Sequence, residues 1–217
     1  AGARVTVPHA QTCCGALQAH AGLRDTSRAL ITENARVFAR GSAAGCEAIV
    51  TNSAGCGAAL RESAHLSGDV AFGALARDVS EVLAALGLPA GAQAQHAPLD
   101  ASAPLRVAYH DACHLAHAQK VRSAPRELLR GLPGVALVEL ANSDWCCGSA
   151  GVYNLTQPDL ADAQLTGKLD TIEAARAHLT VASNPGCLLH MRRGAAARGS
   201  SGAIEHLVDV IARAYPA

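Results

Sequence analysis

The stretch VALVELANSDWCCG, residues 135–148, carries an apolar run directly into two adjacent cysteines and a glycine. Its first six residues, Val135–Leu140, have the composition of a short buried strand. The chain contains a second Cys-Cys-Gly, at Cys13–Gly15, which also follows a short apolar segment, Arg4–Pro8. We expect that segment to be a strand as well. The two cysteine pairs lie 133 residues apart.

The sequence after each cysteine pair strengthens this parallel. Each pair is followed by a stretch of helical character, then by an apolar strand, and then by a turn that ends in Gly-Cys. The two endings read IVTNSAGC (49–56) and LTVASNPGC (179–187). Cys56 lies 42 positions after Cys14, and Cys187 lies 40 positions after Cys147. Such self-similarity predicts a duplicated half-domain.

Strand and helix patterns alternate along the rest of the chain. We expect further strands at Glu47–Asn52, Leu105–His110, His178–Ala182 and Ala203–Glu205, and helices at Leu23–Arg40, Val70–Leu86, Pro125–Arg130, Pro158–Ala177, Leu188–Arg198 and Leu207–Tyr215. This alternation predicts an α/β fold of two repeated half-domains, each a mostly parallel sheet flanked by helices. The predicted division is 1–90 for the first repeat, 91–104 for a linker and 105–217 for the second repeat.

Composition narrows the class of function. The 18 basic and 18 acidic residues balance to a net charge of zero, and no basic stripe indicates a nucleic-acid partner. No run approaches the roughly 18–20 apolar residues that a membrane-spanning helix needs. Eight cysteines, four of them in adjacent pairs, favour metal or redox chemistry, since adjacent cysteines rarely bridge each other without strain.

The second repeat places four cysteines just beyond the ends of its predicted strands. Cys113 follows the strand at 105–110, Cys146 and Cys147 follow the strand at 135–140, and Cys187 follows the strand at 178–182. In an open parallel sheet these strand ends meet at one edge, where ligands bind. Four cysteine thiolates are the usual ligand set of an iron–sulfur cluster. We therefore predict that these four cysteines bind iron in such a cluster.

The first repeat provides only three equivalent cysteines, Cys13, Cys14 and Cys56, and we predict them as ligands of a second site. By the repeat offset, the counterpart of Cys113 lies before Ala1. We therefore expect the chain to be truncated at its N-terminus, and the full-length protein to carry a cysteine roughly 15–25 residues upstream. Cys46 has no counterpart in the second repeat, and we expect it to be a packing residue.

Six stretches together resemble the cysteine-rich CCG family and, within it, the iron–sulfur subunits of glycolate oxidases (glycolate dehydrogenases). They are CCGALQAHAG (13–22), IVTNSAGCGAALRE (49–62), YHDACHLAHAQ (109–119), PRELL (125–129), CCGSAGVYNLTQP (146–158) and SNPGC (183–187). The resemblance implies a subunit of an oxidoreductase that transfers electrons through an iron–sulfur cluster of the [4Fe-4S] type. An FAD-containing partner subunit would oxidise glycolate to glyoxylate, so no residue of this chain is predicted to be catalytic. The resemblance also implies transfer of electrons towards quinone and a cytoplasmic location, at the periphery of the inner membrane through the partners.

The family motif ends in Cys-x-x-Cys, whereas this chain has Ser53 and Asn184 at the first of those positions. The loss favours an ordinary four-iron cluster over the thiol–disulfide chemistry of heterodisulfide reductase-like relatives. That chemistry, a lactate-utilisation iron–sulfur subunit, a zinc site and a cluster-free first repeat remain the alternatives. His110, His114 and His117 lie close to the cysteine at 113, where they could bond to cluster sulfurs, carry protons or simply pack.

Overall fold

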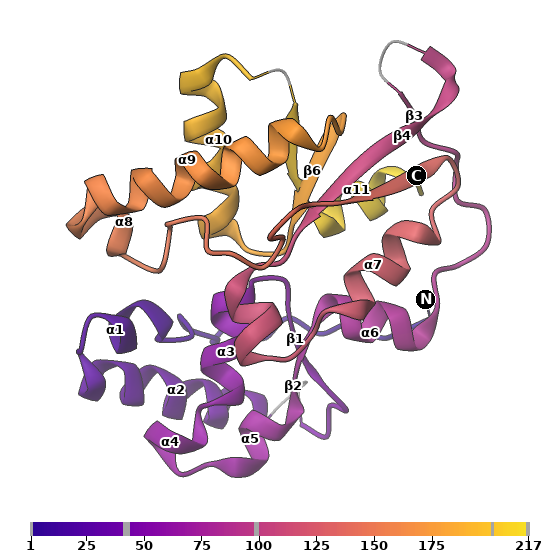
Figure 1. The fold of residues 1–217 in the computed structure, drawn as a ribbon. Coiled ribbons are helices and arrows are strands. Elements are labelled where there is room, and N and C mark those ends of the chain that lie inside the picture. The colour runs from indigo at the N-terminus through magenta and orange to yellow at the C-terminus, as the bar shows by residue number, and fades with distance from the viewer. Residues whose placement is uncertain (1, 41–43, 98–99, 201, 216–217) are drawn as a thin grey trace.

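The structure of the chain is a computed structural model that describes residues 2–40, 44–97, 100–200 and 202–215 (Figure 1). The helices are α1 Ala16–His20, α2 Arg24–Phe38, α3 Ala54–Arg61, α4 Ala64–Ser67, α5 Val70–Leu75, α6 Val79–Leu86, α7 Ser123–Arg130, α8 Tyr153–Thr156, α9 Pro158–Ala174, α10 Pro185–Arg198 and α11 Leu207–Arg213, with a π-helix, η2, at His114–Ala118. The strands are β1 Ile49–Thr51, β2 Ala76–Asp78, β3 His96–Ala97, β4 Asp100–His110, β5 Val135–Glu139, β6 Leu179–Ala182 and β7 Ala203–His206. The predicted α/β class is confirmed. In the part of the chain that the structure describes, no helix is long and apolar enough to cross a membrane.

The larger sheet belongs to the second half of the chain. Its parallel strands lie in the order β5-β4-β6-β7, and the short β3 pairs antiparallel with the beginning of β4. All four residues of β6 are buried, as expected for a central strand of a parallel sheet covered on both faces. Helices α9 and α10 begin with a proline, whose missing N–H costs nothing in the first turn.

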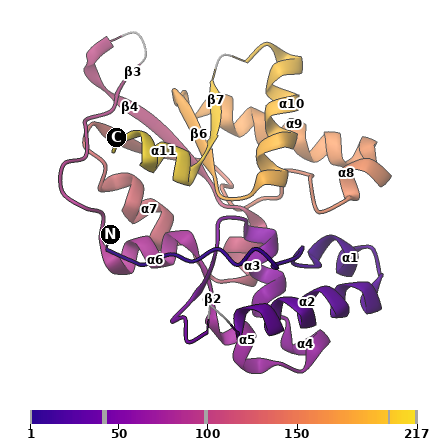
Figure 2. The ribbon, with the colours of Figure 1, turned by 180° about the vertical axis from the view of Figure 1, so that it is seen from behind.

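The smaller sheet, in the first half, has the two parallel strands β1 and β2. Its core combines Ile31 of α2 and Ile49 of β1 with Leu60 of α3 and Phe72 of α5. Seen from behind, α1, α2, α4 and α5 gather around this sheet, while α9 and α10 lie on the other half (Figure 2). Each half is therefore a parallel sheet flanked by helices, which confirms that prediction too.

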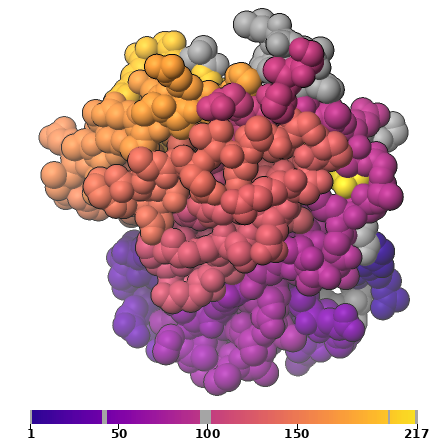
Figure 3. All heavy atoms as spheres, turned by 45° about the vertical axis from the view of Figure 1, so that its right-hand side comes forward, coloured from indigo at the N-terminus to yellow at the C-terminus, as the bar shows by residue number. Residues whose placement is uncertain are grey.

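The two halves meet where their strands end. The backbone N–H of Ala54, after β1, donates to the carbonyl oxygen of Ser183, after β6, at 3.0 Å. The ring Nε2 of His206, at the end of β7, lies 2.7 Å from the carbonyl oxygen of Asn52. In the space-filling view the salmon-coloured middle of the chain lies directly against the purple N-terminal part (Figure 3). The carboxyl ends of both sheets therefore face one shared junction.

Two predicted elements of the first half are wrong. The segment Arg4–Pro8 is not a strand, and Val5 and Val7 are 81% and 65% exposed. An apolar run needs a neighbouring strand to complete its hydrogen bonds, and among the described residues this run pairs with none. The sequence 70–86 is not one helix either, because β2 separates α5 from α6. Asp78 ends that strand and begins α6, since its side chain accepts from the N–H of Ser80 in a capping box with Glu81.

The predicted linker 91–104 contains regular structure. Residues 96–97 form β3, and β4 begins at Asp100 rather than at Leu105, while residues 98 and 99 lie outside the described residues. The division of the chain at 90 and 105 itself stays a prediction. Helix and strand bounds elsewhere differ from the predicted ones by up to about three residues; α10, for example, begins at Pro185 and not at Leu188.

Candidate metal centre

Three loops at the carboxyl edge of the larger sheet carry the four predicted cysteines. Cys113 follows β4 and is the N-cap of η2, whereas Cys187 occupies the first turn of α10 after β6. Cys146 and Cys147 lie in the loop after β5. Cys147 and Cys187 are only 1% and 2% exposed, and Cys113 and Cys146 are partly exposed. The structure therefore brings all four to one edge, as predicted, while their role as ligands stays a prediction.

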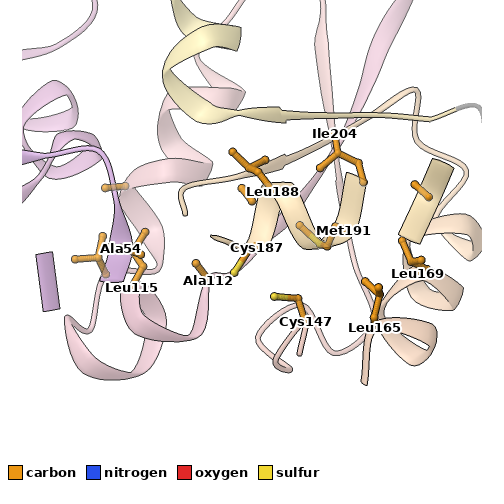
Figure 4. Packing of buried hydrophobic residues seen from close by; sticks show 14 residues of the cluster. Ala54, Ala112, Leu115, Cys147, Leu165, Leu169, Cys187, Leu188, Met191 and Ile204 are labelled. Atoms are coloured by element: carbon orange, nitrogen blue, oxygen red, sulfur yellow. The ribbon is translucent and has the colours of Figure 1, made fainter. Parts of the chain in front are cut away.

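The most buried donors of this site are two thiols and one imidazole. A ring nitrogen of His110 and the sulfur atoms of Cys147 and Cys187 all lie within 4.8 Å of one another. Figure 4 shows Cys147 and Cys187 on separate segments of the chain, at the edge of the apolar cluster that includes Met191 and Leu165. Packing on that side keeps water from the two sulfur atoms, so any group held there would have a dry inner face.

The thiols share their protons unequally. The pKa of Cys146 falls to about 2, because Cys113 and then Cys147 donate hydrogen bonds to its sulfur. The pKa of Cys187 also falls well below its usual value, first through the hydrogen bond from Cys147, against the effect of burial, and further through His110 and Asn184. The pKa values of the two donors, Cys113 and Cys147, rise correspondingly. In this arrangement Cys113 and Cys147 donate hydrogen bonds to Cys146 and Cys187, which have the lowered pKa values. A metal ion that bound all four sulfur atoms would displace the two donated protons.

Two further hydrogen bonds point at the sulfur atoms. The N–H of Gly148 donates to Cys146 Sγ at 3.3 Å, and Asn184 Nδ2 donates to Cys187 Sγ, also at 3.3 Å. Gly148 has φ 92, and a Cβ there would lie 2.3 Å from the carbonyl oxygen of Ala161. Only glycine fits this turn, which is why a glycine follows the cysteine pair.

The first half repeats part of this arrangement. Hydrogen bonds from Cys14 and then from Ser53 lower the pKa of Cys56 to about 6, against the effect of burial. Cys13 is exposed. Ser53 and Asn184, the residues that replace the first cysteine of Cys-x-x-Cys, thus each bond to the sulfur three positions later. Each departure from Cys-x-x-Cys thus replaces a cysteine with a hydrogen-bond donor.

The three histidines near Cys113 have separate environments. Nδ1 of His114 lies 3.7 Å from Cys113 Sγ, and its ring meets that of His20 from the first half at 5.3 Å. Burial, followed by the nearby His20, lowers the pKa of His114. His117 faces away, with Nε2 3.3 Å from the carbonyl oxygen of Asp144. His110, which the sequence already placed close to the cysteine at 113, is fully buried at the thiols.

A buried ion pair fixes the strand end that leads to Cys113. Arg126 of α7 donates from Nη1 and Nη2 to the two carboxylate oxygens of Asp111, at 2.8 and 2.6 Å. Burial would raise the pKa of Asp111, but the hydrogen bonds and charge of Arg126 lower it below its usual value. Arg126 also lies over the ring of Tyr109, 5.2 Å from its centre. No pattern in the sequence indicates this pair, because its two partners lie 15 residues apart on different elements.

A pocket of about 480 Å³ opens beside the partly exposed side of the site. It is lined by Trp145, Cys146, Gln164 and Lys168, among others. Lys168 is itself buried, and its Nζ donates to the carbonyl oxygens of Asn142 and Ser143 at 2.7 and 3.3 Å. Cys146 is therefore the cysteine of this site that lies against an open pocket.

The donor set fits an iron–sulfur cluster in its chemistry. Four sulfur donors, two of them with lowered pKa values, match the thiolates that hold such clusters, and backbone and amide N–H groups are directed at sulfur, as in sites that tune cluster potentials. The ring Nε2 of His110 is a buried polar atom without a hydrogen-bond partner among the described residues. A group bound between these side chains would give that atom a partner.

Comparison with known proteins agrees with the geometry. The sequence is 35% identical to the probable glycolate oxidase iron-sulfur subunit of Bacillus subtilis, over 99% of this chain and 48% of the relative. It is 32% identical to the glycolate oxidase iron-sulfur subunit of Escherichia coli, over 93% of this chain and 48% of that protein. It is 28% identical to lactate utilization protein A of Geobacillus kaustophilus, over 97% of this chain and 86% of the relative. The chain thus spans about half the length of the two glycolate oxidase subunits.

A family model also matches most of the chain. The model of the cysteine-rich domain, CCG, matches residues 1–61 and 107–192. These two ranges contain both Cys-Cys-Gly motifs, as well as Cys56, Cys113 and Cys187, and they lie in different halves of the structure. The chain belongs to the cysteine-rich CCG domain family.

Proposed function

We propose that this chain is part of an iron–sulfur subunit that carries electrons within a glycolate dehydrogenase-type oxidoreductase. The observation that supports this most directly is the group of four cysteines at one sheet edge, of which two have strongly lowered pKa values. Two bacterial proteins named as iron–sulfur subunits of glycolate oxidases, one of them as probable, are identical to this chain at about a third of the aligned positions.

The proposed cluster is a [4Fe-4S] cluster on Cys113, Cys146, Cys147 and Cys187. When bound, such a cluster accepts and releases one electron at a time. The protein's own part is to hold the four sulfurs, to exclude water on the side of Cys147, and to direct the N–H of Gly148 and the amide of Asn184 at sulfur. These bonds favour the electron-rich form and tune the potential.

The first half holds a second, less complete site in this proposal. Cys13, Cys14 and Cys56 would supply three ligands of that site. Electrons would come from an FAD-containing partner subunit that oxidises glycolate to glyoxylate and would continue towards quinone. The complex would be cytoplasmic and held at the inner membrane through its partners. A lactate-utilisation role is the second candidate, because lactate utilization protein A matches nearly the whole chain.

Metal analysis of the full-length protein, purified without oxygen, tests the cluster. We expect iron and acid-labile sulfide in equal amounts, and we expect Cys147→Ser to lose the iron of one cluster. Cys46→Ser is the matched control, because Cys46 packs in the first half away from the four cysteines. Zinc in place of iron, or full iron content in Cys147→Ser, would refute the proposed site.

Substrate assignment needs the complex with its flavin subunit. We expect glycolate to bleach the visible absorption of the cluster under anaerobic conditions, and lactate to do so at least tenfold more slowly. Faster bleaching by lactate would move the assignment to the lactate-utilisation class. Turnover of a disulfide substrate by metal-free protein would support the thiol–disulfide alternative instead.

A further inference from the structure

Asn184 lies where the two halves of the chain meet, and its side chain does not do what its position predicts. It is the N-cap of α10. The side chain of an N-cap asparagine usually accepts a hydrogen bond from an N–H in the first turn of its own helix. Asn184, by contrast, caps no N–H of the described helix α10. Its amide is therefore available for contacts outside that helix.

The two ends of this amide contact different halves. Its Oδ1 accepts from the backbone N–H of Gly55, in the first half, at 3.3 Å. Its Nδ2 donates to the sulfur of Cys187, in the second half, also at 3.3 Å. A backbone N–H can only donate, so the amide atom that faces Gly55 must be the oxygen. The contact with the first half thus determines that a donor, and not an acceptor, points at the sulfur.

The bond to Gly55 also meets a need of the first half. Gly55 is the second residue of α3, and the first N–H groups of a helix have no acceptor within the helix. Hydrogen bonds that follow one another in a chain polarise and strengthen each other. More negative charge on the sulfur of Cys187 would strengthen the bond from Nδ2 and make Oδ1 a better acceptor. A change of charge at this sulfur would therefore reach the N–H that precedes Cys56.

We propose that Asn184 is a positioning residue that couples the redox state of the centre in the second half to helix α3 of the first half. The inference rests on the proposed function, because it needs a redox-active centre at Cys187. The donor that Gly55 holds in place favours the reduced, more negative form, so contact between the halves raises the potential. Coupling between two sites is reciprocal, so reduction tightens the bond between Asn184 and Gly55. The amide gains and loses no proton in either state.

Two substitutions separate the two ends of the amide. Asn184→Asp keeps an oxygen for Gly55 but places a second oxygen at the sulfur. We expect about a tenfold shift of the reduction equilibrium towards the oxidised form, which is about 59 mV for a one-electron couple. Asn184→Ser copies Ser53, which bonds to Cys56 in the first half, and should stay closer to the wild-type potential. Gln157→Ala removes an exposed amide that makes no cap bond to α9 and should leave the potential unchanged.

Amide exchange of Gly55 measures the other end of the coupling. The full-length protein would be compared in its oxidised form and after anaerobic reduction with dithionite, by mass spectrometry that resolves single residues. We expect Gly55 to exchange about twofold or more slowly in the reduced wild type, because the bonded chain is then more strongly polarised. In Asn184→Ser, whose side chain is too short to span both partners, the two states should exchange equally. A merely structural contact would protect Gly55 to the same extent in both states.

The outcomes separate this inference from the proposed function. Wild-type protein without iron and sulfide would overturn both. A loaded centre with equal Gly55 exchange in the two redox states would overturn the inference alone, as would an unchanged potential in Asn184→Asp. If the variants do not fold, the comparison of oxidised and reduced wild type still decides, because it needs no substitution.

Discussion

At the scale of single residues, the pair between Asp111 and Arg126 joins the strand that leads into the metal site to helix α7. Asp111 is 2% exposed, and Arg126 also pairs with Glu139 at 3.0 Å on its outer side. A buried carboxylate is tolerated only with a partner of this quality. The position of Cys113, two residues later, therefore depends on an interaction that involves no cysteine.

We expect Asp111→Asn to lower the free energy of unfolding by about 3 kcal/mol, because it leaves a largely buried guanidinium without its main counter-charge. The matched control is Arg130→Gln, which removes only an exposed pair with Glu139 at 3.2 Å and should cost less than about 1 kcal/mol. Urea titration of both variants checks this. If both variants lost the same free energy of unfolding, the buried pair would not stabilise the protein more than the exposed one.

The same carboxyl group predicts a dependence of stability on pH. The pKa of Asp111 is lower in the folded protein than the value of about 3.9 in an unfolded chain. Its contribution is therefore complete above about pH 4 and is lost as the pH falls through the folded-state pKa. Urea midpoints measured from pH 6 downwards should fall more steeply below pH 4 in wild type than in Asp111→Asn. If the urea midpoints of the two proteins fell equally with pH, Asp111 would not be the source of this pH dependence.

At the scale of helices and strands, α9 and α10 approach each other through a glycine. A Cβ on Gly194 of α10 would lie 2.7 Å from Leu165 and 2.8 Å from Leu169, both buried on α9. Gly167, within α9 itself, has open space at the same position. Two glycines in neighbouring helices thus have opposite surroundings.

Replacing each glycine with alanine should separate packing from helix propensity. Alanine gains about 1 kcal/mol over glycine inside a helix, and Gly167→Ala should keep that gain. In Gly194→Ala, overpacking against the two leucines costs about 1–3 kcal/mol. We expect Gly167→Ala to be the more stable variant by about that amount in thermal or urea unfolding. Equal stabilities would mean that the two helices separate without cost.

The sequence predicted most elements of the second half and fewer of the first. Strands such as β6 are fully buried, so their apolar composition is a sufficient signal. The strand β2 has only three residues, one of them an exposed arginine, and its pattern disappears between two apolar helices. The exposed segment 4–8 has a strand's composition but pairs with no strand among the described residues. Whether a segment pairs with a neighbouring strand depends on the whole fold and cannot be read from its local composition.

Some residues of the candidate site could be predicted from the sequence and others could not. Its cysteines were predictable, because spacing and strand ends place them together. His110 was already named among the histidines near Cys113, but its burial and its bond to Ser143, 33 residues away, required the structure. Arg126 was not predictable, since its importance comes from its partner Asp111, 15 residues away. The substitutions at 53 and 184 could be seen in the sequence. Their role as hydrogen-bond donors to sulfur required the structure.

At the scale of the whole molecule, the junction between the halves is polar and largely buried. Gln119, 4% exposed, donates from Nε2 to the carbonyl oxygen of Ala54 at 2.9 Å, and its backbone carbonyl oxygen accepts from Arg61 Nη1 at 2.8 Å. A Cβ on Gly57 would lie 2.7 Å from the Gln119 amide, so only a glycine leaves room for it there. The glutamine therefore ties the second half to α3 of the first.

We expect Gln119→Ala to destabilise the protein by about 1–3 kcal/mol, because the carbonyl of Ala54 loses its partner inside the junction. Amide exchange should then accelerate at residues 54–58, which follow β1. Gln164→Ala, on the exposed side of α9, is the matched control and should stay within about 0.5 kcal/mol of wild type. Unchanged exchange at 54–58 would contradict the role given to this contact.

The uneven burial of the four cysteines gives the proposed centre a dry side and a wet side. Cys147 and Cys187 face the apolar core, whereas Cys113 and Cys146 reach towards solvent, beside an exposed tryptophan, Trp145. Electrons tunnel most readily over the shortest path, and for the proposed cluster that path would lead through the partly exposed side. It is equally the side from which dioxygen would reach the irons. A partner docked over Cys146 would at once shorten the route for electrons and shield the cluster from oxidative damage.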